Sequence, residues 1–559
     1  MKSFECASTA GMMDEMSVFQ RSTGRKLKLS ESISPFVSRP QLMASMLKSL
    51  PSAYPWEILF SAMPYWESLT RILHIPSFAR DCEEIFNAVR AGMEVLPSIV
   101  RESLVPQLLA TLALSARFST GIKPSENERI TEVQIGTYAA LVKQWMDNLT
   151  GKERLNFYSL QTQTLLVLVH QANNASPSSL WKESGDLVRS AMIMGLQLDP
   201  TEYSEFSLFE KEQRRKLWRT IVELDIQFSL AASMPTALRA SDFQMGSLKN
   251  VDDKNLGAEM IEYPPEKGQH VWTDAIAQIA LGPSLVERLD AANRIGGHVN
   301  LNLDGSFLLQ RAADIEKSLQ NLPTVARLDT GLGPNNDKAP QRLFARIILN
   351  VFIRRPAFNI YRAITLSSQR SRYPEARKGA IRSAIELLSH LDALDPTVAD
   401  LNIIKDRDLL NLFHLLCKND IMQAAHFLCF EIQKLGQSTP GEAQNRYSPS
   451  EEISWTKHSL TRIVENTLNS LLQRLGQFGS DLKDVLPLSI VLHSVRSGGT
   501  RNEKLELMHR GSERVLSACR LVMPEITEIA TMRNSEGKGT VVCGEVLHFV
   551  EAELTGIEP

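Results

Sequence analysis

The chain has 559 residues, of which 43% are hydrophobic and 22% are charged, a balance that excludes a wholly disordered chain and supplies enough apolar side chains for a large core. Its 61 basic and 64 acidic residues leave a formal net charge of −3 at pH 7, which excludes a strong overall attraction to nucleic acid or to an anionic membrane. Any contact with DNA would therefore be local.

The six cysteines are too widely spaced to form a zinc knuckle, because the two closest, Cys417 and Cys429, are twelve residues apart. Scattered single thiols without a secretory leader are typical of a protein in a reducing compartment. No apolar run approaches the roughly 18 to 20 residues that a membrane-spanning helix needs. We therefore expect no bound metal, no other cofactor and no membrane segment.

Residues 1–40 are polar and rich in Ser, Thr and Met, and this composition predicts a disordered tail. The tail contains a basic cluster of Arg21, Arg25, Lys26 and Lys28. The cluster could be a nuclear import signal or the remnant of a basic linker, but an ordinary solvated tail often contains such a cluster as well.

From residue 41 onward, apolar residues recur at helical spacing and predict a series of helices, hence an all-α fold. Pro76 ends the first helical stretch within the turn Leu73-His74-Ile75-Pro76-Ser77-Phe78. His74 could be a metal ligand or a base, but no Cys, His or carboxylate lies near it in helical register, which favours a turn histidine bonded to backbone. Further helices are predicted over 84–92, 98–118 and 132–149.

The next stretch predicts three consecutive helices, over 160–173, 178–194 and 207–232. Gly195 ends the second helix and Pro235 closes the third. The spacing of Ser207 and Glu210 is that of a capping box at the start of the third helix.

The third helix carries charged residues beside its apolar stripe. Arg214, Trp218, Ile221 and Asp225 follow one another at steps of four, three and four, so they share one face, and Trp218 is predicted to be buried. A buried carboxylate at Asp225 needs a partner that donates hydrogen bonds, and Arg189 on the preceding helix is the candidate. The alternative is that Asp225 lies at the edge of the stripe and is solvated.

Beyond residue 242 the composition predicts loops over 247–269 and 329–338 and a long helix over 342–364 that contains Pro356. More helices are predicted over 375–391, 406–434, 451–476, 482–495 and 503–521. The last nineteen residues contain four glutamates and no Lys or Arg. They could form a short activation segment or a terminal helix packed on the body of the protein.

Two runs of residue types at fixed spacing lie within residues 181–242. The first run is Arg189, Ala191, Gly195 and Leu196, and the second is Glu212, Arg214, Arg215, Lys216, Trp218, Asp225, Ser229 and Pro235. An Arg355-Pro356 pair occurs in the long helix further on. With these residues and the turn around His74, the chain resembles the middle homology region of the fungal-specific transcription factor domain, the regulatory module of zinc binuclear cluster regulators. The departures from the family pattern are Gln197, Arg219, Ser233, Met234 and Arg354.

The resemblance implies a large multi-helical array or bundle. We expect the regulatory domain over residues 41–370, after the tail of residues 1–40, and a helical region over 371–559 packed on the same body. The matching residues would then be structural framework and not phosphate contacts: Arg189, Gly195, Arg214, Arg215, Trp218, Asp225, Pro235, Arg355 and Pro356. Zinc is a family feature, but this sequence does not contain the six-cysteine cluster that binds it. Either the protein lacks the cluster, or Met1 is a misassigned start and an upstream exon encodes the six cysteines.

The motifs that mark hydrolases, zinc proteases and nucleotide-binding enzymes do not occur in the sequence, so we expect no enzyme. The expected function is a nuclear transcription regulator that controls a metabolic or secondary-metabolite pathway. Its expected partners are a DNA-binding relative or the transcription machinery, in a homodimer or heterodimer, and a small-molecule inducer, with only indirect contact to DNA. The alternative is a helical scaffold outside transcription that senses a metabolite or binds a protein.

Overall fold

The computed structural model describes most of the chain, and every regular element in the described part is helical. The described residues are 12, 15–20, 38–51, 56–91, 101–118, 129–244, 246–297, 301–331, 338–400, 403–405, 407–437, 455–477, 480, 482–496 and 500–524. The predicted all-α fold is thereby confirmed.

The chain forms two compact units. Unit 1 consists of Met1–Lys28, Ile381–Ala393 and Cys417–Pro559, and unit 2 consists of Leu29–Ala380 and Leu394–Leu416. The division into segments at residues 40 and 370 that the sequence suggested stays a prediction.

Unit 2 begins with seven helices among its described residues, and α5 is the most deeply buried of them. α5 packs against α3, α6 and α8, and nearly all its side chains are buried because Leu, Val and Ala occur on every side of the helix. The bounds are α2 (Arg39–Ser49), α3 (Trp56–Glu67), α4 (Ile75–Arg90), α5 (Leu104–Phe118), α6 (Glu132–Asp147), α7 (Gly151–Arg154) and α8 (Phe157–Ala172).

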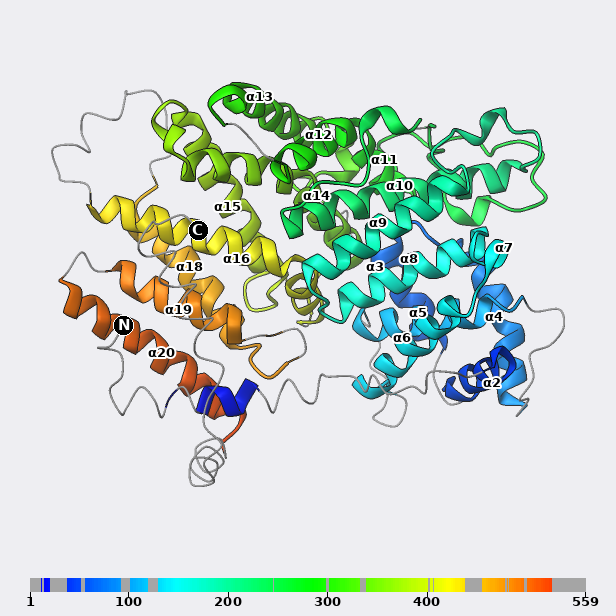
Figure 1. Ribbon diagram of the computed structural model, residues 1–559, viewed down its shortest axis with the longest axis horizontal. Helices are drawn as coiled ribbons and strands as arrows, with labels where there is room; N and C mark the ends of the chain where they lie inside the picture. The colour runs from blue at the N-terminus through cyan, green and yellow to red at the C-terminus, as the bar shows by residue number, and fades with distance from the viewer. Residues whose placement is uncertain are drawn as a thin grey trace. The chain divides into compact units, whose positions relative to one another are not determined.

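Next come α9 (Pro177–Ile193) and α10 (Leu208–Ala232), and with α8 they lie side by side in Figure 1. These are the three consecutive helices that the sequence predicted, and no bound is shifted by more than three residues. The capping box is also confirmed: Ser207 Oγ accepts a hydrogen bond from the Glu210 N–H at 3.2 Å, and Glu210 Oε2 accepts one from the Ser207 N–H at 2.8 Å.

In the described residues between α10 and α11 the only helical elements are short 3-10 turns, in agreement with the predicted loop over 247–269. These turns are η3 (Ala240–Asp242) and η4 (Asp253–Asn255), after η2 (Pro200–Glu202) between α9 and α10. Unit 2 continues with α11 (Ile276–Leu281), η5 (Gly282–Ser284), α12 (Leu285–Ile295), α13 (Leu301–Gln320), η6 (Thr324–Ala326), α14 (Ala339–Leu366) and η7 (Ser368–Ser371). α14 continues through Pro356 as one helix.

Unit 1 contains residues 381–393 of α15 (Pro374–Leu394), residues 417–437 of α16 (Asp408–Gln437), α18 (Lys457–Leu472), α19 (Leu482–Arg496) and α20 (Arg501–Val522). α18, α19 and α20 lie side by side, in orange in Figure 1. α19 and α20 approach closely at Gly511, where a Cβ atom would lie 2.8 Å from the Ser489 carbonyl oxygen. Ser489 Oγ in turn donates to the Gly511 carbonyl at 2.8 Å.

Part of the predicted disordered tail is ordered in unit 1. Residues 15–20 are helical, Met16 and Phe19 are buried, and Glu15 pairs with Arg520 of α20 at 2.8 Å. The prediction is wrong for these residues because their apolar side chains are buried in unit 1, and local composition does not reveal such tertiary contacts. The basic cluster at residues 21–28 and the acidic last nineteen residues lie outside the described residues.

Candidate functional site

Among the residues of α10 that match the family pattern, Trp218 is buried. Its side chain is 2% exposed, as the helical stripe predicted. Its indole packs edge-on against the ring of Phe243, with ring centroids 5.8 Å apart. The indole Nε1 is buried and has no hydrogen-bond partner among the residues that the structure describes. Trp218 therefore stabilises the fold through the packing of its apolar surface and not through a hydrogen bond.

Asp225 is fully buried, but its predicted pairing with Arg189 is wrong. Its Oδ2 accepts a hydrogen bond from the Ala237 N–H at 2.8 Å, and its Oδ1 accepts one from Ser184 Oγ at 3.3 Å. The Arg189 side chain is 69% exposed and lies 3.6 Å from Asp186. Burial raises the pKa of Asp225 to about 6, because the two neutral donors and the charge of Arg189, which acts without an ion pair, compensate the lost hydration only in part.

The register of α9 explains this correction. The buried residues of α9 are Leu180, Ser184, Gly185, Leu187, Val188 and Ala191. Arg189, one residue after Val188, is not among them. The sequence alone does not show which face of α9 meets α10.

The turn after α10 is held by hydrogen bonds to the carbonyl oxygen of Pro235. Trp181 Nε1 donates to it at 2.8 Å and Ser229 Oγ at 3.3 Å. The end of α12 lies against the same turn, since a Cβ atom at Gly296 would come within 2.1 Å of the Met234 carbonyl carbon. Together with the contact from Ala237 to Asp225, these bonds fix the chain path from α10 into the following loop.

Gly195 and Arg214 complete the carboxyl end of α9. Gly195 adopts the left-handed conformation at φ 73°, which glycine accommodates best. The Leu196 N–H donates to the Ala191 carbonyl at 3.1 Å, and Arg214 Nη2 donates to the Met194 carbonyl at 2.7 Å. Arg214 thus links α10 to the last turn of α9.

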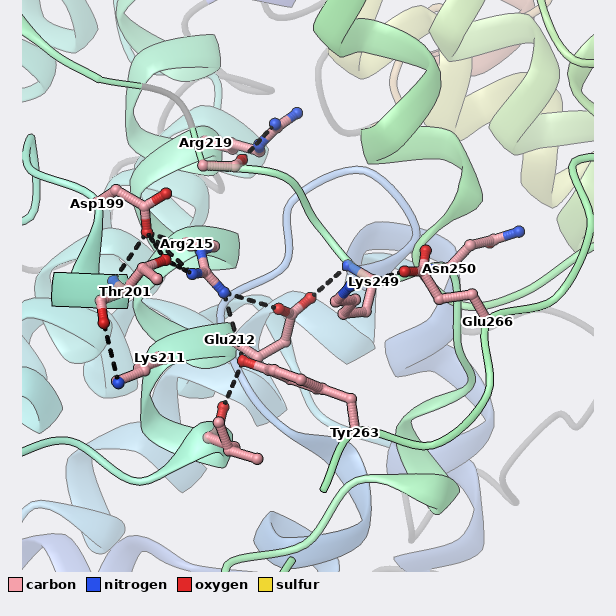
Figure 2. A network of polar contacts seen from close by, with 12 residues as sticks. Asp199, Thr201, Lys211, Glu212, Arg215, Arg219, Lys249, Asn250, Tyr263 and Glu266 are labelled. Atoms are coloured by element: carbon pink, nitrogen blue, oxygen red, sulfur yellow. Dashed lines mark hydrogen bonds and ion pairs between the residues drawn. The ribbon is translucent and has the colours of Figure 1, made fainter. Parts of the chain in front are cut away.

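Arg215 lies at the centre of a polar network on another side of α10 (Figure 2). Its Nη2 lies 2.9 Å from Asp199 Oδ1 and 2.6 Å from Thr201 Oγ1, and its Nη1 lies 3.4 Å from the Tyr263 hydroxyl. Burial opposes ionisation of Asp199, but hydrogen bonds from Thr201 and Arg215 hold its pKa below the usual value. The network joins the loop before α10 to the loop after it.

Figure 2 also shows Glu212, which extends this network toward the second loop, and Arg219, which makes a separate contact with that loop. Glu212 Oε1 accepts from the Lys249 N–H at 3.0 Å, and its carboxylate lies 3.5 Å from Arg215. Arg219 Nη2 donates to the Gly246 carbonyl at 2.8 Å. Arg219, a departure from the family pattern, therefore makes a loop contact of its own.

A cluster of buried ions lies beside Lys216. Asp253 Oδ1 is 2.9 Å from Lys216 Nζ and 2.5 Å from Arg71 Nη2, and all three side chains are buried. Burial works against the charged form of Asp253, but the two cations hold its pKa far below the usual value. Burial raises the pKa of the neighbouring Glu67 to about 8.

His74 belongs to the edge of this cluster. Its Nδ1 lies 2.8 Å from Ser77 Oγ at the start of α4, and its Nε2 lies 2.8 Å from the Asp253 carbonyl oxygen. The favoured interpretation of a turn histidine bonded to backbone is therefore confirmed. The cluster itself was missed, because Arg71, Lys216 and Asp253 come from three distant parts of the chain; the only local signal was a lysine in the apolar register of α10.

Arg355 and Pro356 are buried in α14. Arg355 Nη1 donates to Gln227 Oε1 at 2.5 Å, and Gln227 Nε2 donates to Glu223 Oε1 at 2.6 Å. Glu223 also pairs with the fully buried Arg288 at 2.6 Å. These bonds connect α10, α12 and α14.

The pattern residues thus gather on α9, α10 and α14, and each arginine among them has a protein partner. In the described part of the chain, no three or more His, Cys, Asp or Glu side chains are grouped as metal ligands. None of the described helices combines the length and apolarity needed to cross a membrane.

Residues 56–258 match the family model described as the fungal specific transcription factor domain. The chain is 26% identical over 355 residues to the transcription factor opdR of Penicillium oxalicum, a match that covers 62% of this chain and 43% of opdR. It is 21% identical over 390 residues to the equisetin cluster transcription factor eqxF of Fusarium heterosporum, covering 67% of this chain and 53% of eqxF.

A yeast protein is also similar: activator of stress genes 1 of Saccharomyces cerevisiae is 26% identical over 226 residues, which is 39% of this chain and 22% of that protein. The chain therefore matches only about a fifth to a half of the length of these relatives. No solved structure is significantly similar to it. The matching family is described as a transcription factor domain and these relatives are named as transcription factors, so the similarity of residues 56–258 is to transcription factors and not to enzymes.

Proposed function

We propose that the protein is a nuclear transcription regulator and that unit 2 is its regulatory module. The observation that carries the proposal is the domain match over residues 56–258 together with relatives named as transcription factors. Because the name of eqxF refers to a cluster, control of a metabolic or secondary-metabolite pathway is the form of regulation that we propose.

We propose further that the chain reaches DNA through a protein partner and holds no cofactor. The bonding of Arg215 supports the indirect contact with DNA, because Arg215 pairs with Asp199 and donates to Thr201, so this pattern arginine does not offer an unengaged guanidinium to a phosphate. The net charge of −3 also offers no broad attraction. The partner would be a DNA-binding relative or the transcription machinery, bound as a homodimer or heterodimer, and a small-molecule inducer would set the activity.

The test combines localisation with the transcriptome of a deletion strain. Tagged protein should be found in the nucleus, and deletion should change the transcripts of a restricted gene set that reintroduction of the gene restores. Protein confined to the cytosol under every growth condition, with unchanged transcripts, would contradict the proposal and favour a helical sensor or scaffold outside transcription.

A further inference from the structure

A pocket of about 240 Å³ lies in unit 2, beside the pattern residues at the start of α10. Five aromatic side chains line it: Phe78, Phe157, Tyr158, Phe206 and Phe209. Its volume is below the roughly 300 to 1,000 Å³ of pockets for drug-sized ligands, so a ligand would be about the size of one ring with a short substituent.

The amino-terminal turns of three long helices contribute to the wall of this pocket. His74, Ser77 and Phe78 come from the start of α4, Phe157 and Tyr158 from the start of α8, and Phe209 from the start of α10. The amino end of a helix carries partial positive charge, which favours an anionic ligand, and at α10 the carboxylate of Glu210 in the first turn already offsets part of this charge.

Gln213 is a polar group in the wall whose side-chain nitrogen lacks a protein partner among the described residues. Its side chain is 7% exposed, and its Nε2 is buried without a hydrogen-bond acceptor anywhere in the described part of the chain. A buried amide donor in this state destabilises the protein unless a ligand or water accepts its hydrogen bond.

Arg214 adds a positive charge beside Gln213. Its guanidinium lies over the ring of Phe206, 4.3 Å from the ring centroid, and its hydrogen bond goes to the neutral Met194 carbonyl. Among the described residues, no carboxylate lies within ion-pair distance of it. Desolvation lowers its pKa, and the nearby charge of Glu210 offsets this effect only in part.

The other charged groups of the wall are engaged with neighbours. Arg101 pairs with Asp81 at 2.8 Å and lies over the Tyr158 ring at 4.2 Å. Glu210 accepts hydrogen bonds from the N–H and the hydroxyl of Ser207 at 2.8 and 2.9 Å. Arg214 is therefore the cation in this wall that makes no ion pair with a described carboxylate, and a ligand carboxylate could take that place.

We propose that this pocket binds a small aromatic carboxylic acid, with its ring among the aromatic side chains and its carboxylate on Arg214 and Gln213. Tyr158, which is 44% exposed, would lie at the mouth. As the site of an inducer, the pocket rests on the proposed function; as a binding site, it can be tested on the purified chain alone.

The experiment is isothermal titration calorimetry of the purified full chain with benzoate, phenylacetate and 4-hydroxybenzoate, and with benzamide as the neutral counterpart of benzoate. At least one acid should bind saturably at one site, and benzamide should bind roughly tenfold more weakly or not at all, since it lacks the charge that pairs with Arg214. Absence of binding by all three acids, or equal binding of benzoate and benzamide, would overturn the proposal.

Three variants locate the site. Gln213→Glu keeps the side-chain size but adds a negative charge, and should abolish binding of the acid, while Arg214→Met should weaken it roughly tenfold or more. Arg189→Met changes an exposed arginine and should bind as the wild type does. Because Arg214 also contacts α9, the circular dichroism melt of each variant is compared with that of the wild type. Undiminished binding in a folded Gln213→Glu protein would place the ligand elsewhere and overturn the proposal.

The outcomes for binding and for transcription are separable. Binding of an acid to the wild-type pocket, with transcripts unchanged on deletion, would support the proposed binding site and contradict the proposed role in transcription. Changed transcripts without binding of any acid would contradict the proposed binding site and leave the proposed role in transcription intact.

Discussion

The carboxylate of Asp225 in α10 accepts a hydrogen bond of 2.8 Å from the backbone N–H of Ala237, in the turn that follows the same helix. The bond joins a fully buried side chain to the first residues of the loop, and it is made without an arginine partner. This arrangement makes the turn sensitive to the charge of one residue.

Ionisation of Asp225 should destabilise unit 2. The folded-state pKa of about 6 lies above the usual value of 3.8, so the stability contribution of the protonated form is complete below about pH 4 and is lost as the pH rises toward 6. The expected loss is about 2 to 3 kcal/mol. Asp225→Asn should remove this dependence, while Asp186→Asn, on the exposed side of α9, should keep it.

Chemical unfolding followed by tryptophan fluorescence provides the measurement, because six of the seven tryptophans belong to unit 2. Melts between pH 4 and pH 7.5 compare the two variants with the wild type. An Asp225→Asn protein whose stability follows the pH curve of the wild type would show that Asp225 does not carry the effect.

Arg189 and Asp225 should behave as independent sites. Arg189→Ala should change the unfolding free energy by less than about 0.5 kcal/mol, as is usual for exposed residues. Its coupling with Asp225→Ala should stay below about 1 kcal/mol, because the two side chains do not pair and only the charge of Arg189 acts on Asp225. A coupling energy above about 1 kcal/mol in the double-mutant cycle would contradict the observed arrangement.

Trp218→Ala should destabilise unit 2 by about 3 to 5 kcal/mol, the usual cost of removing a buried large aromatic side chain. Trp218→Phe should cost clearly less, since the indole N–H has no partner to lose. Urea melts followed by far-ultraviolet circular dichroism compare the two variants. A loss below about 1 kcal/mol for the alanine variant would place Trp218 at the surface.

Gly296→Ala should disturb the turn after α10, because the added Cβ would meet the backbone of Met234 and Pro235. Overpacking of this kind costs about 1 to 3 kcal/mol. The matched control is Gly257→Ala, where a Cβ atom would meet nothing within 4 Å. Equal thermal midpoints for the two variants would show that Gly296 does not lie in close contact with the backbone of Met234 and Pro235.

Asp253→Ala should be among the most damaging changes in unit 2, at about 3 to 5 kcal/mol, because it leaves Arg71 and Lys216 buried without their shared anion. Lys216→Met should cost less, since Asp253 keeps Arg71 as its partner. Denaturant melts of both variants test this order. A reversed order would mean that Arg71 alone does not stabilise the Asp253 carboxylate.

Local features of the sequence predicted the helices well, whereas the contacts between helices required the structure. The Ser207 and Glu210 capping box and the glycine at 195 placed the end of α9 and the start of α10 within one residue, because such signals act within one turn. The same signals do not show how α9 is rotated against α10, and the pairing of Arg189 with Asp225 was wrong for that reason. The ion cluster at Asp253 joins residues far apart in the chain, and Gln213 became conspicuous only once its burial was known.

Promoter occupancy in cells tests the regulatory role most directly. Chromatin immunoprecipitation of the tagged full chain, sequenced beside an untagged strain, should recover the promoters of genes whose transcripts change on deletion, and removal of the DNA-binding partner should abolish the signal. A chain that is present and folded in the nucleus, but enriches no promoter above the untagged strain under any growth condition that alters those transcripts, would contradict the account.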